Sequence, residues 1–157
     1  MEIIKFEKMK RILFSLLILA VSVLAVQAQC GEVLLKQALK EMGNGQYIKD
    51  YPVDLVKEKK DSNTGYVKYS IILNSRSQYR FTIINGTSNS ESVIAQLYDG
   101  ERLLATNYDG GKMYKSFEVV IGKTKVYNLV FSFKGGAEGC ASAVQSLVKQ
   151  FTAEEMK

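Results

Sequence analysis

The fold is decided by the stretch Val93-Ile-Ala-Gln-Leu-Tyr98, the turn Asp99-Gly100 and the run Arg102-Leu-Leu-Ala-Thr106. Both runs are short, apolar and bounded by turn residues, which is typical of β-strands. Asp-Gly between two such runs is a strong signal for a tight hairpin. The stretch therefore predicts two antiparallel strands joined at Asp99-Gly100.

Runs of similar length flank this hairpin on both sides of the chain. In the run 66–73, alternate residues are apolar and fall on one face, which is the pattern of a half-buried strand. Proline occurs once, at Pro52, and suits an edge strand because it cannot donate to a ladder. The predicted strands besides the hairpin cover residues 47–56, 66–73, 78–84, 114–121 and 125–133.

The segment 141–151 is ambiguous, because its alanines allow a helix while the preceding strand needs a hairpin partner. We favour a strand over 140–148, followed by a flexible tail over 150–157. Seven or eight short strands, with turn signals every eight to twelve residues, point to a β-sandwich. The fold class expected is therefore mainly β, a jelly-roll-like antiparallel sandwich, with residues 29–157 as a single domain and strands over about 47–148.

One helix is expected before the strands. Val33, Leu34, Leu35, Ala38, Leu39 and Met42 recur at helical spacing, and Gly43-Asn44-Gly45 is a stop signal. The sequence thus predicts a short N-terminal helix over about 31–43.

The N-terminal 28 residues have the pattern of a cleaved secretory signal peptide. Lys8, Lys10 and Arg11 precede an apolar run over 12–26, which Val26-Gln27-Ala28 closes with small residues suited to cleavage. The run is short for a membrane span, which needs about 20 apolar residues. We therefore expect an exported protein, in the periplasm or outside the cell, whose mature domain is not transmembrane. Translation from Met9 rather than Met1 would give a more compact basic region.

The chain has two cysteines, Cys30 and Cys140. In an exported protein they predict one disulfide, which would close a loop of about 110 residues and stabilise the fold by roughly 4–5 kcal/mol. The alternative is that Cys30 is lipidated, which would make the protein an envelope-anchored lipoprotein with a structural role. Gln29 directly before the cysteine fits a lipidation signal badly, so we favour the disulfide.

Charge and composition exclude several classes of function. The leader carries a net charge of +2, which leaves +3 of the chain's +5 for residues 29–157. Basic and acidic residues are interspersed, so no nucleic-acid footprint is present and no nucleic-acid partner is expected. The chain has no histidine, which rules out Ser-His-Asp and Cys-His catalysis and histidine-ligated metals.

Carboxylates are the remaining candidates for catalysis. Asp99, Glu101 and Asp109 could act in pairs on a glycan, or bind Ca²⁺ with Asn107. Asp99-Gly100 and Asp109-Gly110 are explained by turn chemistry alone. We therefore expect no catalytic residue, no metal site and no cofactor, and we keep a carboxylate-dependent glycan-active enzyme as the weaker alternative.

Tyrosines gather around the two Asp-Gly turns. Tyr98, Tyr108 and Tyr114 lie close in sequence to Asp99 and Asp109. Tyrosines beside polar loops can form a surface for a sugar or a protein. These five residues form a candidate loop binding patch, which we call the predicted loop binding patch. The alternative, favoured by ordinary aromatic burial, is that the tyrosines pack at the rim of the sandwich.

The strands also carry a resemblance to a known family. The segments 79–83, 94–105 and 125–133 resemble the strands of bacterial pre-peptidase C-terminal domains, with a Y-x-F strand, an L-Y-D hairpin and a closing Y-x-L strand. The chain also resembles small uncharacterised exported proteins of Bacteroidetes-type bacteria. The resemblance implies an accessory or binding module, with an unknown protein or glycan partner at the envelope, rather than an enzyme.

Overall fold

The computed structural model describes residues 31–55, 65–86, 93–136 and 139–156. The predicted signal peptide over residues 1–28 and the predicted disulfide partner Cys30 lie outside the described residues. Both therefore stay predictions. Within the described part of the chain, no helix is long and apolar enough to cross a bilayer.

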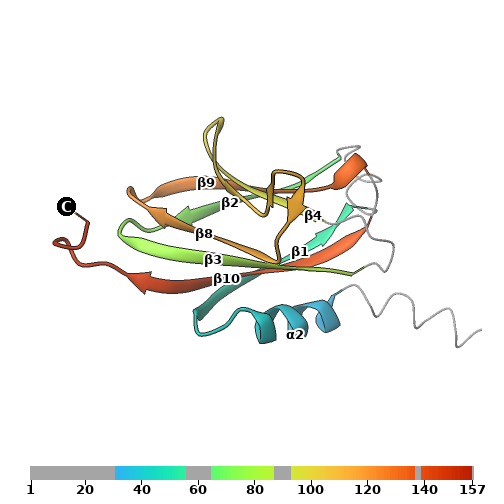
Figure 1. The fold of residues 1–157 in the computed structure, drawn as a ribbon, viewed down its shortest axis with the longest axis horizontal. Coiled ribbons are helices and arrows are strands. Elements are labelled where there is room, and N and C mark those ends of the chain that lie inside the picture. Colours follow the sequence, from blue (N-terminus) through green and yellow to red (C-terminus); the bar gives the residue numbers. More distant parts are fainter. Residues whose placement is uncertain (1–30, 56–64, 87–92, 137–138, 157) are drawn as a thin grey trace, which may run out of the picture.

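Two four-stranded antiparallel sheets pack face to face (Figure 1). Sheet A has the order β1-β10-β3-β8 and sheet B the order β2-β9-β4-β5. Successive long strands alternate between the sheets or turn back within one, which is the double Greek key of a jelly roll. The predicted mainly β, jelly-roll-like sandwich is therefore confirmed. The strands are β1 (Gln46–Asp54), β2 (Val67–Leu73), β3 (Ser77–Asn85), β4 (Val93–Asp99), β5 (Arg102–Thr106), β6 (Tyr108–Asp109), β7 (Lys112–Met113), β8 (Ser116–Ile121), β9 (Lys125–Phe133) and β10 (Cys140–Gln150).

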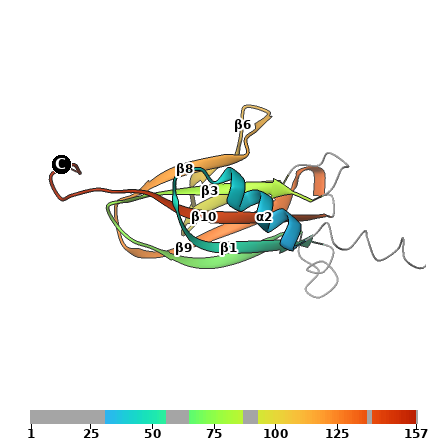
Figure 2. The ribbon, with the colours of Figure 1, turned by 90° about the horizontal axis from the view of Figure 1, so that it is seen from below.

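The predicted helix is present as α2 (Glu32–Glu41), and it lies on the outer face of sheet A, across β10 and β3 (Figure 2). The segment that was ambiguous in sequence is strand β10, in the centre of sheet A between β1 and β3. Pro52 is in β1, which is an edge strand as expected. A short 3₁₀ turn, η1 (Lys134–Gly136), follows β9.

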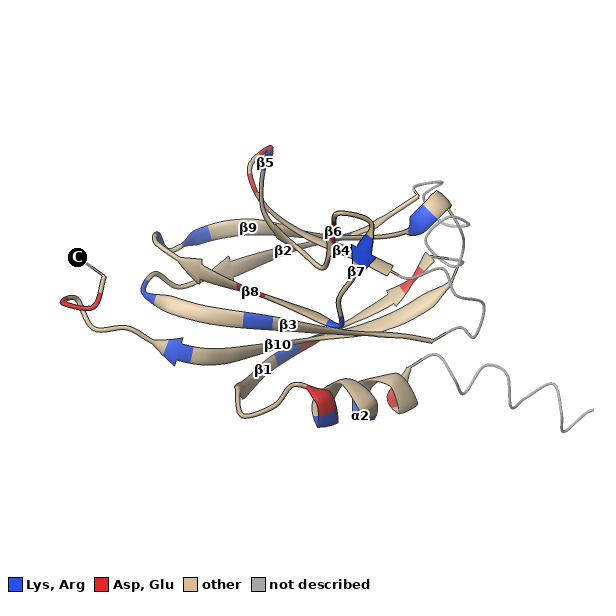
Figure 3. Cartoon of the chain, viewed as in Figure 1, with Lys and Arg blue, Asp and Glu red and all other residues tan. Residues whose placement is uncertain are grey.

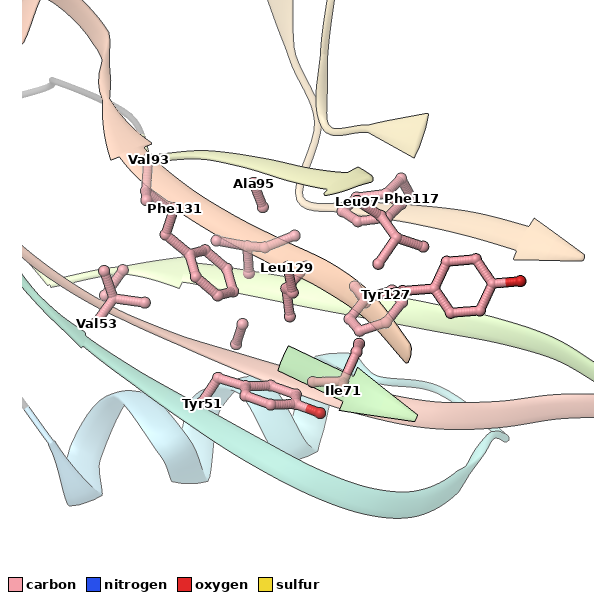
Figure 4. Packing of buried hydrophobic residues seen from close by; sticks show 14 of the residues in the cluster. Tyr51, Val53, Ile71, Val93, Ala95, Leu97, Phe117, Tyr127, Leu129 and Phe131 are labelled. Carbon is pink, nitrogen blue, oxygen red and sulfur yellow. The ribbon is translucent and has the colours of Figure 1, made fainter. Parts of the chain in front are cut away.

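The core lies between the two sheets and consists of the inward-facing residue of each alternating pair (Figure 4). Phe81 on β3 stacks on Phe117 on β8, with ring centroids 5.1 Å apart. Tyr51 is almost fully buried, and its hydroxyl donates to Oε1 of Gln145 at 2.6 Å. Because both polar groups have a partner, they can be buried without a large desolvation cost.

The segment around the predicted Asp109-Gly110 turn forms two short strands that sequence interpretation did not include. Tyr108 pairs with Met113, and Asp109 with Lys112, in a small hairpin. Gly110 and Gly111 turn it with φ angles of 55° and 82°, a region that glycine adopts at little cost. Two turn glycines in a row were enough for a hairpin, and the sequence interpretation missed it because each flanking strand has only two residues.

The C-terminal segment makes hydrogen bonds to the sandwich and within itself. Gln150 belongs to β10, and the amide of Phe151 donates to the carbonyl of Arg76 at 2.7 Å. Thr152 and Glu155 then hydrogen-bond to each other, which forms a compact turn. The strand therefore continues to residue 150, beyond the predicted end at 148.

Candidate functional site

The outer face of sheet A is covered by α2 over its central strands, β10 and β3. Leu34 and Ala38 of α2 are buried on it, in a small cluster with Ile84 and Val144. At the C-terminal end of the helix, Nη1 of Arg80 donates to the carbonyl of Met42 at 2.9 Å. That carbonyl is one of the groups that a helix end leaves without an internal partner, so Arg80 fixes α2 to the sheet.

The outer face of sheet B carries no such cover among the described residues. Large apolar side chains are exposed on and beside it: Ile72 to 70%, Val126 to 56%, and Tyr66 and Leu103 to 45% each. Soluble domains seldom leave such side chains clustered on one face unless the face meets a partner. We call this surface the bare face and define it by the outward positions of β2, β4 and β9: Lys68, Ser70, Ile72, Ile94, Gln96, Tyr98, Val126, Asn128, Val130 and Ser132.

A shallow groove of about 400 Å³ crosses the bare face. Strand register positions its lining, because Tyr98 is directly opposite Asn128, and Lys68 is directly opposite Val130. Opposite side chains in antiparallel strands lie within direct contact of one another. The groove is lined by Tyr66, Lys68, Tyr98, Gly100, Glu101, Asn128 and Val130.

The groove combines aromatic and polar groups. Tyr66 comes directly before β2 and Tyr98 lies in β4, and β9 separates these two strands in sheet B. Both tyrosines line the groove. Between them, Asn128 supplies an amide, and its Oδ1 accepts from the hydroxyl of Ser70 at 3.3 Å. Lys68 and Glu101 add one charge of each sign. Such a surface can stack on an apolar ring face and hydrogen-bond to hydroxyls around it.

The structure does not bring the five residues of the predicted loop binding patch together. Tyr98 lines the groove on the bare face, whereas Asp99, the next residue, lines a different groove between β5 and β8. Neighbouring residues of a strand point to opposite sides, so these two cannot act on one ligand in the same groove. Tyr108, Asp109 and Tyr114 lie on or beside the β6–β7 hairpin.

That hairpin is anchored away from Asp99 by Asn107, which is 2% exposed. Oδ1 of Asn107 accepts from the amide of Ala95 at 2.8 Å, and its Nδ2 donates to the carbonyls of Val93 and Tyr114. Ala95 and Asp99 are four residues apart in β4, or about 13 Å. The Asp99-Gly100 turn follows the end of β4, whereas the β6–β7 hairpin is held near Ala95. The structure therefore separates the five residues, and their role in binding stays a prediction.

Asp99 is already engaged by cations. Nζ of Lys125 lies 2.6 Å from its Oδ1, and Nη2 of Arg102 lies 3.6 Å from its Oδ2. Both oxygens of this carboxylate are therefore in ion pairs within the protein. Among the described residues, no three acidic or cysteine side chains gather in a way that would hold a metal ion.

Cys140 is buried at the start of β10, beside the N-terminal end of α2. Gly31, the residue after Cys30, lines the same groove as Cys140. The residue that follows the predicted disulfide partner therefore lies near Cys140. The disulfide itself stays a prediction, because Cys30 is outside the described residues.

The groove residues that sequence interpretation missed are Tyr66, Lys68 and Asn128. Alternation in 66–73 and 125–133 already separates an inward set from an outward set in each strand. The outward set alone does not indicate which sheet a helix will cover. The missing information was therefore the position of α2.

Neither protein-family models nor curated proteins match the sequence. Among solved structures, one that is similar is the crystal structure of PliG from Aeromonas hydrophila, a periplasmic lysozyme inhibitor of g-type lysozyme. The identity is 12% and the TM-score 0.47, over 68% of this chain and 91% of that chain. Because both values are low, this likeness assigns neither a partner nor a function to this chain.

Proposed function

We propose that this protein is an exported, non-enzymatic binding module that holds a glycan on the bare face of sheet B. The observation that carries the proposal is the difference between the two outer faces. A helix buries its apolar side chains on sheet A, whereas sheet B presents Tyr66 and Tyr98 around a polar groove. The N-terminal signal pattern supports export, and the resemblance to pre-peptidase C-terminal domains supports an accessory role.

The chemistry of the groove favours a sugar ligand. A sugar ring has an apolar face that stacks on tyrosine and a rim of hydroxyls that pair with amides and charged groups. Tyr66, Tyr98, Asn128 and Lys68 supply these groups within one groove. The side chains offer less for catalysis, because the carboxylate of Asp99 is held by Lys125 and Arg102.

The test is a glycan array probed with the purified protein and with three single variants. We expect Tyr98→Ala and Tyr66→Ala to lose binding while retaining the far-ultraviolet circular dichroism of the parent. Tyr114→Ala is the matched control, because Tyr114 is 52% exposed but lies beside the β6–β7 hairpin. If Tyr114→Ala alone loses glycan binding, the binding surface lies at that hairpin and not on the bare face.

A parallel pull-down from envelope extract separates glycan from protein partners. If Tyr98→Ala removes a bound protein while the array stays blank, the bare face is a binding surface but the glycan assignment is wrong. If neither tyrosine variant changes any binding, the bare face is not the site.

A further inference from the structure

We propose that a second groove, between the edge strands β5 and β8, binds an extended acidic segment of a partner protein as an added strand of sheet A. This groove is separate from the one on the bare face, and the two share no lining residue. The inference therefore does not depend on the glycan proposal.

The groove has the size and lining for an extended peptide. Its volume is about 440 Å³, and Leu104, Val119 and Ile121 give it an apolar part. Leu104 and Val119 also pack against the core, so the groove opens directly from the sandwich interior. An apolar strip of this kind suits the alternate side chains of a docked strand.

The edge of β8 offers backbone groups for pairing. β8 ends the strand order of sheet A, and no described strand pairs with its outer side. The amide of Ile83 donates to the carbonyl of Lys115 at 2.7 Å, and Phe81 is opposite Phe117 in the same register. Because bonding alternates along an antiparallel pair, Glu118 and Val120 direct their amide and carbonyl groups away from β3. Those groups are a template for a further strand.

The charge of the groove selects the partner. Arg102, Lys123 and Lys125 lie around the single carboxylate of Asp99. Lys125 and Arg102 both contact that carboxylate, and Lys123 has no acidic partner among the described residues. The hydroxyl of Tyr127 donates to the carbonyl of Lys123 at 2.8 Å, which fixes the turn that carries this lysine. The groove is therefore cationic by two charges.

The acidic side chain of β8, Glu118, does not reduce this charge. Oε1 of Glu118 lies 2.6 Å from Nη2 of Arg80, which also binds the end of α2. Both side chains are thus on the outer face of sheet A, away from the groove. In Figure 3, Lys and Arg mark the ends of β9 and β10 on the side of the molecule where the C-terminus is labelled.

An acidic strand satisfies both features at once. Its backbone pairs with Glu118 and Val120, and its carboxylates meet Lys123 and Arg102. A small anion would use the cations alone, and a neutral strand would use the edge alone. Complementary charge also speeds association and makes it sensitive to salt.

The test uses labelled peptides of alternating glutamate and valine, measured by fluorescence anisotropy against the purified full chain. A second peptide of the same sequence has N-methyl groups at alternate residues, so that it keeps its charge but cannot pair. A third has lysine in place of glutamate. We expect only the first to bind, and its affinity to fall as salt is raised.

Matched protein variants locate the site. We expect Lys123→Glu to lower the affinity for the first peptide about tenfold or more. Lys36→Glu makes the same charge change on α2, where Lys36 is exposed, and should leave the affinity unchanged. The backbone amide of Val120 points away from β3 and makes no hydrogen bond to that strand. Val120→Pro removes this amide and should therefore abolish peptide binding. An unchanged circular dichroism spectrum would show that the variant is folded.

Three results would overturn the proposal. The first is equal binding of the methylated and unmethylated peptides, which would identify a charged surface without strand pairing. The second is equal weakening by Lys123→Glu and Lys36→Glu. The third is no binding of the glutamate–valine peptide up to millimolar concentration at low salt.

Discussion

The outer faces of the two sheets differ although both belong to the same sandwich. Sheet A is covered by α2, and the side chains beneath the helix form a second, smaller apolar cluster. Sheet B leaves Ile72 and Val126 largely in solvent. The comparison shows that outward side chains can stabilise the fold on one face and stay available for a partner on the other. Four sets of substitutions test the two sheets.

The largest expected effect is on the covered face. Leu34→Ala removes a side chain that is 5% exposed in the cluster under α2, and it should lower the free energy of unfolding by about 2–4 kcal/mol. Ile72→Ala on the bare face should change it by less than about 0.5 kcal/mol, because Ile72 is already exposed. Urea unfolding of both variants measures the difference. Similar losses for the two would mean that the bare face is packed against something in solution.

Sheet B should instead depend on a polar anchor at its margin. Asn107→Ala leaves the amide of Ala95 and the carbonyl of Val93 without their side-chain partner, and we expect a loss of about 2–3 kcal/mol. Asn128→Ala makes the same change on the bare face and should cost little. Thermal unfolding of the two variants measures the difference. A small loss of stability in Asn107→Ala would show that water replaces the side-chain amide there.

The inner side of sheet A gives a pH effect. Burial raises the pKa of Tyr51 to about 12 from its ordinary value of 10. A group whose pKa is raised in the folded state stabilises the fold fully below the unfolded pKa, so this contribution is lost as the pH rises from about 10 to about 12. We expect a loss on the order of 2 kcal/mol over that range. The free energy of unfolding of Tyr51→Phe should fall less steeply over this pH range, which urea unfolding at each pH measures. Parallel pH curves for the variant and the parent would show that Tyr51 is not the cause.

The smallest expected effect is a gain of stability under α2. Oγ1 of Thr82 is buried and has no hydrogen-bond partner among the described residues. Thr82 is opposite Val144, which packs against the helix, so its side chain faces α2. Thr82→Val keeps the shape and removes the buried hydroxyl, and it should raise the free energy of unfolding by about 1 kcal/mol.

Thr82→Ser is the control for that substitution. It keeps the hydroxyl and loses a methyl group, so we expect it to destabilise the protein. Denaturant midpoints of the two variants should therefore move in opposite directions. Movement in the same direction would mean that the hydroxyl has a bonded water beneath the helix.

Much of the sandwich could be predicted from residue patterns. The alternation in 66–73 and 125–133 placed Ile71, Tyr127 and Phe131 inside, and each is buried. The Asp99-Gly100 turn is where β4 ends and β5 begins shortly after. The local signal was weaker for 141–151, because short alanine and serine side chains suit a strand under a helix as well as a helix.

The binding surface was harder to predict. Tyr98 was singled out for its position beside an Asp-Gly turn, and it does line the groove. Its partners there are Lys68 on β2, Asn128 on β9 and Tyr66, which directly precedes β2. The other residues of the predicted loop binding patch lie elsewhere. Asp99 lines the β5–β8 groove. Tyr108 lies in the β6–β7 hairpin, where the ammonium of Lys134 is 5.6 Å from the centre of its ring.

The sequence by itself determined the class of fold, the eight longer strands, the N-terminal helix and the expectation of export, because these depend on local periodicity and turn chemistry. Only the tertiary structure decided which outer face is covered and which side chains share a groove. Those features depend on strand register and on where α2 packs, and both join residues that are far apart in the chain. The hairpin around Asp99-Gly100 was therefore visible in the sequence, while the different surroundings of Tyr98 and Asp99 on its two sides were not.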